Sequence, residues 1–117
     1  MRIRQISEKI GVENEIIDIN FGGKDHLYLK CISLFSKYDF ISEIESAIIE
    51  KNYKLIENKA HALKGISANL GFKELFELSS KIVNDVREKT YDEIPCLFKY
   101  LKIEYERIVN ILNYLEF

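Results

Sequence analysis

The chain contains little of the two residues that most often interrupt secondary structure. Its 117 residues include 1 proline and 5 glycines, which excludes collagen-like, mucin-like and linker compositions. Hydrophobic residues make up 47% of the sequence and charged residues 31%, so a disordered chain is excluded as well. A chain of this length is expected to form one domain, residues 1–117.

Long apolar runs and an excess of basic charge are also absent. No run approaches the roughly 18 apolar residues of a transmembrane helix, and the start, MRIRQISEKIGVENE, lacks the apolar part of a secretory signal. We therefore expect a cytoplasmic protein that does not contact the membrane. The formal net charge of −2 is unlike the basic excess of nucleic-acid binders, so nucleic acid is not an expected partner.

Cysteine and histidine are scarce too. Cys31 and Cys96 are 65 positions apart, which matches no zinc or redox spacing, and we expect reduced, mostly buried thiols. His26 and His61 are 35 positions apart and have no i,i+4 histidine or cysteine partner. A metal site is therefore not expected, and His26 is interpreted as a surface residue.

Most of the chain has apolar residues at three- and four-residue steps, which predicts helices and no strands. We expect a short helical piece over 14–21, helices over 25–50, 53–70 and 73–88, and a last helix, capped by Asp92, that continues to about Tyr114. Helices of this length with short connections indicate an all-α fold. The predicted architecture is an antiparallel four-helix bundle with a short extra N-terminal helix across one end.

The most informative segment is AHALKGISANLG, residues 60–71. On a helix that turns 100° per residue, Leu63 and Leu70 point together, as expected of a buried stripe. His61 lies roughly 160–180° away from them, so its imidazole is predicted to face solvent. This histidine is the candidate functional residue of the chain.

The predicted neighbours of His61 are unusual for an outer helix face, which normally carries long charged side chains. Lys64, Gly65 and Ala68 follow at i+3, i+4 and i+7. Gly65 costs about 1 kcal/mol relative to alanine inside a helix, but it clears space for another surface to approach the imidazole. Lys64 supplies a cation that suits phosphate. The alternatives are an unspecialised surface histidine and a glycine that serves close helix packing.

Two further stretches complete a pattern. Residues 61–65 (HALKG), residues 68–72 (ANLGF) and residues 21–28 (FGGKDHLY) together resemble the histidine-containing phosphotransfer (HPt) domain family of multistep phosphorelays. The last stretch is similar to the Phe-Gly-Gly-Asp…Leu-Tyr sequence that precedes the family's long second helix. The resemblance covers about residues 14–115.

The resemblance implies that His61 is a phosphoacceptor, which takes a phosphoryl group from the aspartyl phosphate of one receiver domain and passes it to the aspartate of another. It implies that Lys64 stabilises the phosphoryl charge and that Gly65, Ala68 and Asn69 contact the receiver. The implied partners are response-regulator receiver domains and a sensor or hybrid histidine kinase. Mg²⁺ is expected on the receiver, no cofactor on this chain, and the family is usually monomeric. A carrier of this kind is not an enzyme, and no phosphate-binding glycine loop occurs in the sequence.

The sequence departs from the family at one position. Many members carry Glu or Gln 22 positions after the histidine, where it orients the ring, but this chain has Val83. Asn84, Ser80 or a water molecule could take over that hydrogen bond. The family's receiver contact is usually an apolar patch around the histidine, for which Leu70 and Phe72 are candidates beside Ala68. The alternative for Phe72 is that its ring caps the end of the bundle.

Two alternative functions remain open. The phosphoacceptor domain of a kinase, such as the N-terminal domain of chemotaxis kinases, shares the His-x-x-Lys-Gly core and the following Gly-Phe. The Phe21–Gly23 segment and the chain length favour a free-standing relay protein instead. A helical adaptor that docks receivers without being phosphorylated is the second alternative.

Overall fold

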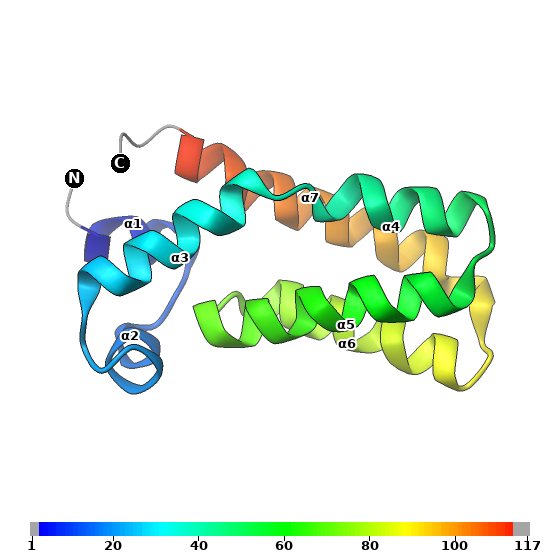
Figure 1. Cartoon of the computed structure of the whole chain (residues 1–117), viewed down its shortest axis with the longest axis horizontal. Coiled ribbons are helices and arrows are strands. Elements are labelled where there is room, and N and C mark those ends of the chain that lie inside the picture. The colour runs from blue at the N-terminus through cyan, green and yellow to red at the C-terminus, as the bar shows by residue number, and fades with distance from the viewer. Residues whose placement is uncertain (1–2, 114–117) are drawn as a thin grey trace.

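A computed structural model describes residues 3–113 (Figure 1). Regular structure in this range is entirely helical, so the all-α prediction is confirmed. The elements are α1 (Ile3–Ile10), α2 (Asn14–Asn20), α3 (Asp25–Lys37), α4 (Phe40–Ile49), α5 (Tyr53–Leu70), α6 (Lys73–Arg87), the 3₁₀ turn η1 (Tyr91–Glu93) and α7 (Ile94–Asn113). Tyr114, the predicted end of the last helix, lies outside the described residues.

The long helices α4, α5, α6 and α7 run along the longest axis of a molecule that measures 42 × 26 × 17 Å (Figure 1). The most extensive contact is between α5 and α6; α6 also packs on α7, and α4 packs on both α5 and α7. Helix α3 continues beyond the N-terminal end of α4, and α1 and α2 lie at that same end of the molecule (Figure 1). There α1 contacts α7, and α2 contacts α5.

The single helix predicted over 25–50 is wrong. Helix α3 stops at Lys37, and Tyr38 is extended, with φ −97° and ψ 132°. The carboxylate of Asp39 then accepts a hydrogen bond from the backbone N–H of Ser42 at 3.0 Å and caps α4. Apolar residues continue at helical spacing across this break, so periodicity did not reveal it.

The N-terminal region holds two short helices where one was predicted. Helix α1, which the apolar pattern did not indicate, buries Ile6 and Ile10. Its Arg4 forms ion pairs with Asp18 of α2 at 3.0 Å and with Asp25 of α3 at 2.9 Å. An isolated helix of this length is marginal, so its stability comes from these tertiary contacts.

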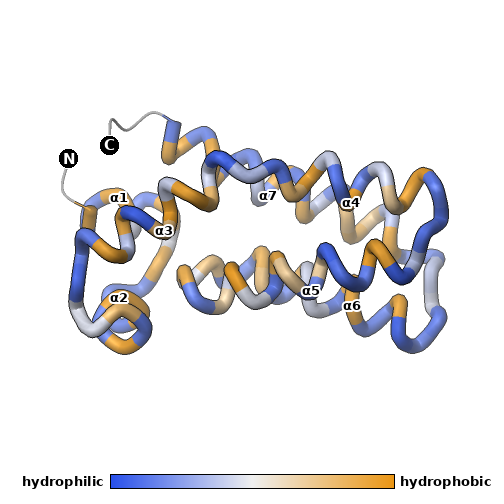
Figure 2. The backbone as a smooth tube through the Cα atoms, viewed as in Figure 1, coloured by the Kyte–Doolittle hydropathy of each residue, from blue (hydrophilic) through white to orange (hydrophobic). Residues whose placement is uncertain are grey.

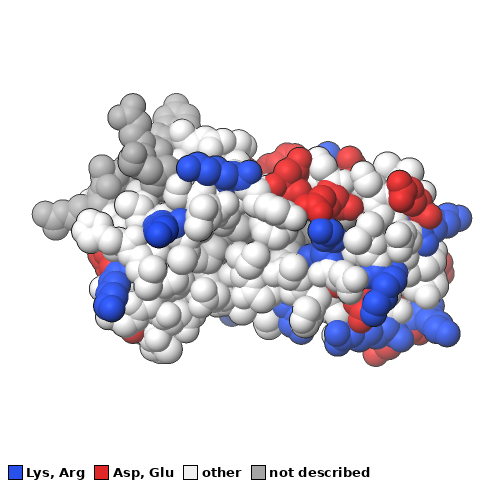
Figure 3. Space-filling view, viewed as in Figure 1, with Lys and Arg blue, Asp and Glu red and all other residues white. Residues whose placement is uncertain are grey.

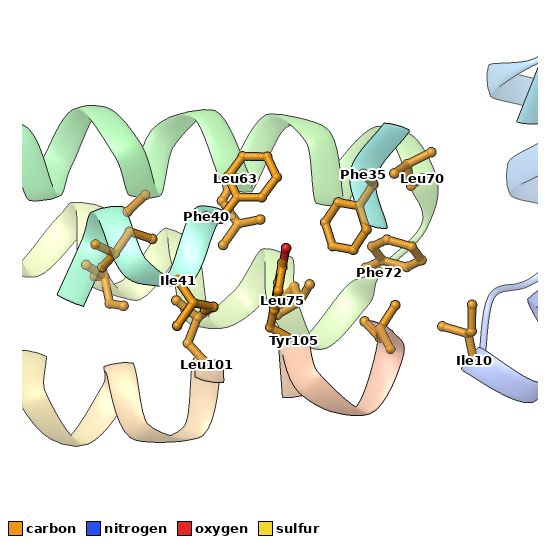
Figure 4. Packing of buried hydrophobic residues seen from close by; sticks show 14 of the residues in the cluster. Ile10, Phe35, Phe40, Ile41, Leu63, Leu70, Phe72, Leu75, Leu101 and Tyr105 are labelled. Atoms are coloured by element: carbon orange, nitrogen blue, oxygen red, sulfur yellow. The ribbon is translucent and has the colours of Figure 1, made fainter. Parts of the chain in front are cut away.

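Aromatic rings fill the core where α3, α4, α6 and α7 meet (Figure 4). The ring of Phe35 lies 5.0 Å from that of Phe72 and 5.3 Å from that of Tyr105, measured between centroids. Phe40 stacks on Phe35 at 5.8 Å. Such pairs add to the stabilisation that burial of each side chain provides.

Hydrophobic and hydrophilic residues alternate along the helices (Figure 2). No helix within residues 3–113 is long and apolar enough to cross a membrane.

The turn between α5 and α6 matches its prediction. Gly71 adopts φ +84°, a left-handed conformation that ends α5 at Leu70. A Cβ at this position would lie 2.9 Å from side-chain carbons of Ile16 and Val12, so the N-terminal segment packs directly on the glycine. The prediction that Asp92 caps the last helix is wrong, because Asp92 lies inside η1 and α7 begins at Ile94.

Candidate functional site

Helix α5 presents His61 near its middle. The side chain of Asn52 accepts a hydrogen bond from the N–H of Leu55 at 3.2 Å and caps the helix, and Ala60 and Leu63 are fully buried. These burials fix the rotation of the helix, so His61 is exposed, as predicted. Within residues 3–113, the imidazole makes no hydrogen bond and no ion pair.

The surface beside His61 is open. Gly65 is exposed, and a Cβ built there would meet no atom of the described residues within 4 Å. The alternative in which Gly65 permits close helix packing is therefore wrong. Ala68 and Asn69 are exposed too, and the Asn69 carbonyl accepts a hydrogen bond from the Asn20 side chain at 3.0 Å. The surface at Gly65 therefore leaves space in which a partner can approach the imidazole.

The three lysines of α5 differ in their surroundings. Lys54 pairs with Glu57 at 3.5 Å, and Lys59 pairs with Glu43. The Lys59 ammonium lowers the pKa of Glu43, and Glu43 raises the pKa of Lys59. Lys64 has no carboxylate partner among the described residues.

The ammonium of Lys64 instead lies over an aromatic ring. Its Nζ atom is 5.8 Å from the centroid of Phe76, which projects from α6. Both side chains are half-buried. Sequence reasoning did not single out Phe76, because the contact joins two helices and leaves no local pattern.

An apolar groove, here called the α3–α5 groove, lies on one side of the histidine. It has a volume of about 440 Å³ and is lined by Cys31, Leu34, Phe35, Tyr38, Phe40, Ala62, Ile66, Asn69 and Leu70. Leu34 is 60% exposed and Tyr38 46% exposed, both large values for apolar side chains. Uncharged atoms cover the middle of this face of the molecule, whereas many charged side chains gather toward the end where α4 joins α5 (Figure 3). Tyr38 and Phe40, which lie at the break between α3 and α4, line this groove, and the predicted continuous helix did not indicate it.

A second cavity, of about 380 Å³, lies where the N-terminal segment meets α5 and α6. Its lining residues are Gly11, Glu13, Ile16, Ser67, Ala68, Gly71, Lys73 and Phe76. The hydroxyl of Ser67 is fully buried and has no hydrogen-bond partner among the described residues. Ala68, which is exposed, is thus a lining residue of this cavity as well as a predicted docking residue.

The predicted docking role of Leu70 and Phe72 is wrong, whereas the burial predicted for Leu70 from the helical repeat is confirmed. Leu70 is only 2% exposed and Phe72 only 3%, because both belong to the core. Ala68 is the one member of that predicted patch that reaches the surface.

Neither side chain predicted to replace the missing Glu or Gln forms a hydrogen bond with the imidazole of His61. Val83 is fully buried, and the Ser80 hydroxyl donates to the Phe76 carbonyl at 2.6 Å. Asn84 is exposed and makes no hydrogen bond to His61. No side chain in residues 3–113 therefore orients the ring by hydrogen bonding.

The cysteines are less buried than predicted. Cys31 is half-buried in the wall of the α3–α5 groove, and Cys96 is exposed on α7; both are unpaired. His26 is exposed, as predicted. Within residues 3–113, no group of three or more His, Cys, Asp or Glu side chains is placed to hold a metal ion.

Comparison of the chain with protein-family models, with curated proteins and with solved structures gave no match. The functional assignment therefore depends on the residues around His61 and on their geometry.

Proposed function

We propose that this chain is a histidine phosphotransfer protein. His61 accepts a phosphoryl group from the aspartyl phosphate of one receiver domain and passes it to an aspartate of another. The observation that carries the proposal is the combination at His61: an exposed imidazole, an open glycine one turn away and a lysine, the imidazole without a hydrogen-bond partner and the lysine without a carboxylate partner among residues 3–113.

The chemistry needs few groups from this chain. A neutral imidazole has a lone pair on one ring nitrogen that is available for attack. That lone pair forms a bond to phosphorus while the bond from phosphorus to the aspartyl oxygen breaks, and the carboxylate leaves with the electron pair. The second ring nitrogen keeps its proton, so the phosphorylated ring carries a positive charge that offsets part of the phosphoryl charge. The reverse sequence delivers the group to the second receiver.

Catalysis of such a transfer is mainly positioning and charge stabilisation. Lys64 supplies a cation within one helical turn of His61. Gly65, Ala68 and Asn69 provide a surface of small or short side chains against which a receiver can approach. The receiver brings Mg²⁺, and this chain holds no cofactor.

The remaining parts of the proposal concern architecture and context. Helices α4–α7 form an antiparallel four-helix bundle, and α5 is the helix that presents the histidine. The α3–α5 groove supplies the apolar contact that members of the family make around their histidine. Residues 1–117 act as one monomeric domain in the cytoplasm, between a sensor or hybrid histidine kinase and response-regulator receivers.

A transfer assay tests the proposal. The parent chain is mixed with a receiver domain that carries labelled aspartyl phosphate and Mg²⁺. We expect label on the parent chain that is stable in base and labile in acid, and no label on His61→Gln. Equal labelling of His61→Gln and the parent would reject His61 as the acceptor. Label that arises only from a kinase with ATP, and never from a receiver, would identify a kinase phosphoacceptor domain.

One observation favours the adaptor alternative. Since Val83 occupies the place of the usual Glu or Gln, no side chain of the described residues fixes the orientation of the His61 ring. An adaptor would bind a receiver equally well after His61→Ala, and no phosphohistidine would be found in the parent. Measuring receiver affinity for both chains beside the transfer assay separates the two functions.

A further inference from the structure

The lysines of α5 differ in the groups that lie next to their ammonium ions. Lys54 and Lys59 each lie beside a carboxylate; Glu57, the partner of Lys54, is shared with Arg87 at 2.7 Å. Lys64 is matched with the ring of Phe76, at 5.8 Å from Nζ to the centroid. The face of an aromatic ring attracts a cation through its quadrupole but carries no net charge. The positive charge of Lys64 therefore remains available to an anion.

The backbone of Phe76 is firmly placed. Its N–H donates to the Phe72 carbonyl at 2.9 Å, and its carbonyl accepts the Ser80 hydroxyl at 2.6 Å. The ring is half-buried between α6 and α5, the pair of helices with the most extensive contact in the molecule. A long lysine side chain on an open surface samples many rotamers. Contact with a ring that projects from a firmly placed backbone favours positions of the Lys64 ammonium near the α5–α6 boundary.

We propose that Phe76 is a positioning residue: its ring holds the Lys64 ammonium on the side of α5 that carries His61 and leaves the charge uncompensated for the phosphoryl group. The role rests on the proposed function of His61. It adds a second helix to the site, because α6 then sets the position of a charge that α5 supplies.

The rate of phosphorylation by a small donor reports this role without a receiver. Phosphoramidate is the probe, and phosphohistidine is followed by ³¹P NMR. An exposed or half-exposed cation–π contact corresponds to about a two- to fivefold effect. We expect Phe76→Leu to lower the rate by about that factor, and Phe76→Tyr, which keeps the ring face, to retain the parent rate. Phe76→Glu, which offers Lys64 a carboxylate, is expected to lower the rate more than Phe76→Leu.

The Lys64→Gln background separates positioning from a general structural effect. If Phe76 acts through Lys64, Phe76→Leu has no further effect once Lys64 is replaced. A second readout is the ring-current shift of the Lys64 ε-methylene protons, expected in the parent and Phe76→Tyr and absent in Phe76→Leu. Thermal unfolding shows whether each variant folds, and Phe76→Met, of similar volume, replaces Phe76→Leu if that chain does not fold.

Three results overturn the inference. Phe76→Leu is phosphorylated as fast as the parent, or Phe76→Leu lowers the phosphorylation rate by the same factor with Lys64 and with Lys64→Gln, or the Lys64 ε-methylene protons of the parent show no ring-current shift. Failure of the proposed function looks different. In that case the parent itself acquires no phosphohistidine from phosphoramidate or a receiver, and the role of Phe76 in transfer is rejected together with that of His61.

Discussion

The hydroxyl of Tyr28 donates a hydrogen bond to the backbone carbonyl of Leu70 over 2.8 Å. Tyr28 lies on α3 and is fully buried, and Leu70 is the last residue of α5. A helix leaves its final carbonyls without intrahelical partners, so this bond satisfies a group that would otherwise be buried without one. It connects the helix that carries His61 to one wall of the α3–α5 groove. Burial raises the pKa of Tyr28 well above its ordinary value.

Tyr28→Phe removes this donor and keeps the ring. Because the Leu70 carbonyl loses its buried partner, we expect a decrease in the free energy of unfolding of about 1–3 kcal/mol. The measurement is urea denaturation at pH 7. A variant as stable as the parent would show that the hydrogen bond contributes no net stability.

The raised pKa of Tyr28 also determines how its contribution to stability depends on pH. Tyrosine in the unfolded chain ionises with a pKa of about 10, whereas burial keeps Tyr28 protonated in the folded chain. Its contribution to stability is therefore complete below about pH 10 and is lost as the pH rises above that value. We expect the parent to lose more stability than Tyr28→Phe between about pH 9 and pH 11. Equal losses would assign the alkaline sensitivity to other groups.

The side chain of Asp39 is expected to stabilise the N-terminus of α4 as its cap. Loss of its cap in Asp39→Ala should lower the free energy of unfolding by about 1 kcal/mol, whereas Asp39→Asn, which also caps, should lose less. Hydrogen bonding by the side chain and backbone of Ser42 lowers the pKa of Asp39. The carboxylate therefore stabilises the fold above the unfolded pKa of about 4, and this contribution is lost as the pH falls further. Denaturation of the three chains at pH 6 and pH 3 checks this, and a gap between parent and Asp39→Ala that does not shrink in acid would contradict it.

Replacement by alanine should have opposite effects on stability at Gly65, inside α5, and at Gly71, directly after it. Gly71→Ala forces a left-handed conformation, at about 1–2 kcal/mol, and places a Cβ against Ile16 and Val12. Gly65→Ala meets nothing and should stabilise the helix by about 0.5–1 kcal/mol. Thermal unfolding of both variants tests the pair. Similar melting temperatures for the two would contradict the difference in packing.

Gly65→Gln tests the open surface beside His61. A glutamine at this position keeps the helix but places a long side chain where a receiver would approach. We expect slower transfer from a receiver, with phosphorylation by phosphoramidate unchanged, and circular dichroism to show an intact helix. Gly65→Ala, with a much smaller side chain, is the matched control. Parent-like transfer rates in Gly65→Gln would remove steric access as the reason for the glycine.

Several features could be predicted from the sequence because their causes are local. Helix α5 has the bounds Tyr53–Leu70 that apolar spacing and Gly71 indicated. The outward direction of His61 follows from its angle to Leu63, which is fixed by the helical repeat. Helix α6 also begins where predicted, directly after the glycine turn.

Other features depended on contacts between distant segments. The break before Phe40 is stabilised by Asp39 and by ring packing among α3, α4 and α7, and the apolar pattern runs through it unchanged. Burial of Phe72, directly after Gly71, likewise depends on the elements that pack against the end of α5. A helical wheel assigns an angle to each residue but does not say which angles other elements cover.

The sequence by itself determined that the chain is helical, where its central helix starts and stops, and that His61 points away from the core, because the helical repeat and the conformational range of glycine act within a few residues. Only the tertiary structure decided that Lys64 meets a ring rather than a carboxylate, that α3 and α5 leave an apolar groove, and that Cys96 is exposed. These outcomes depend on how helices pack, and packing joins residues whose separation in sequence carries no local signal.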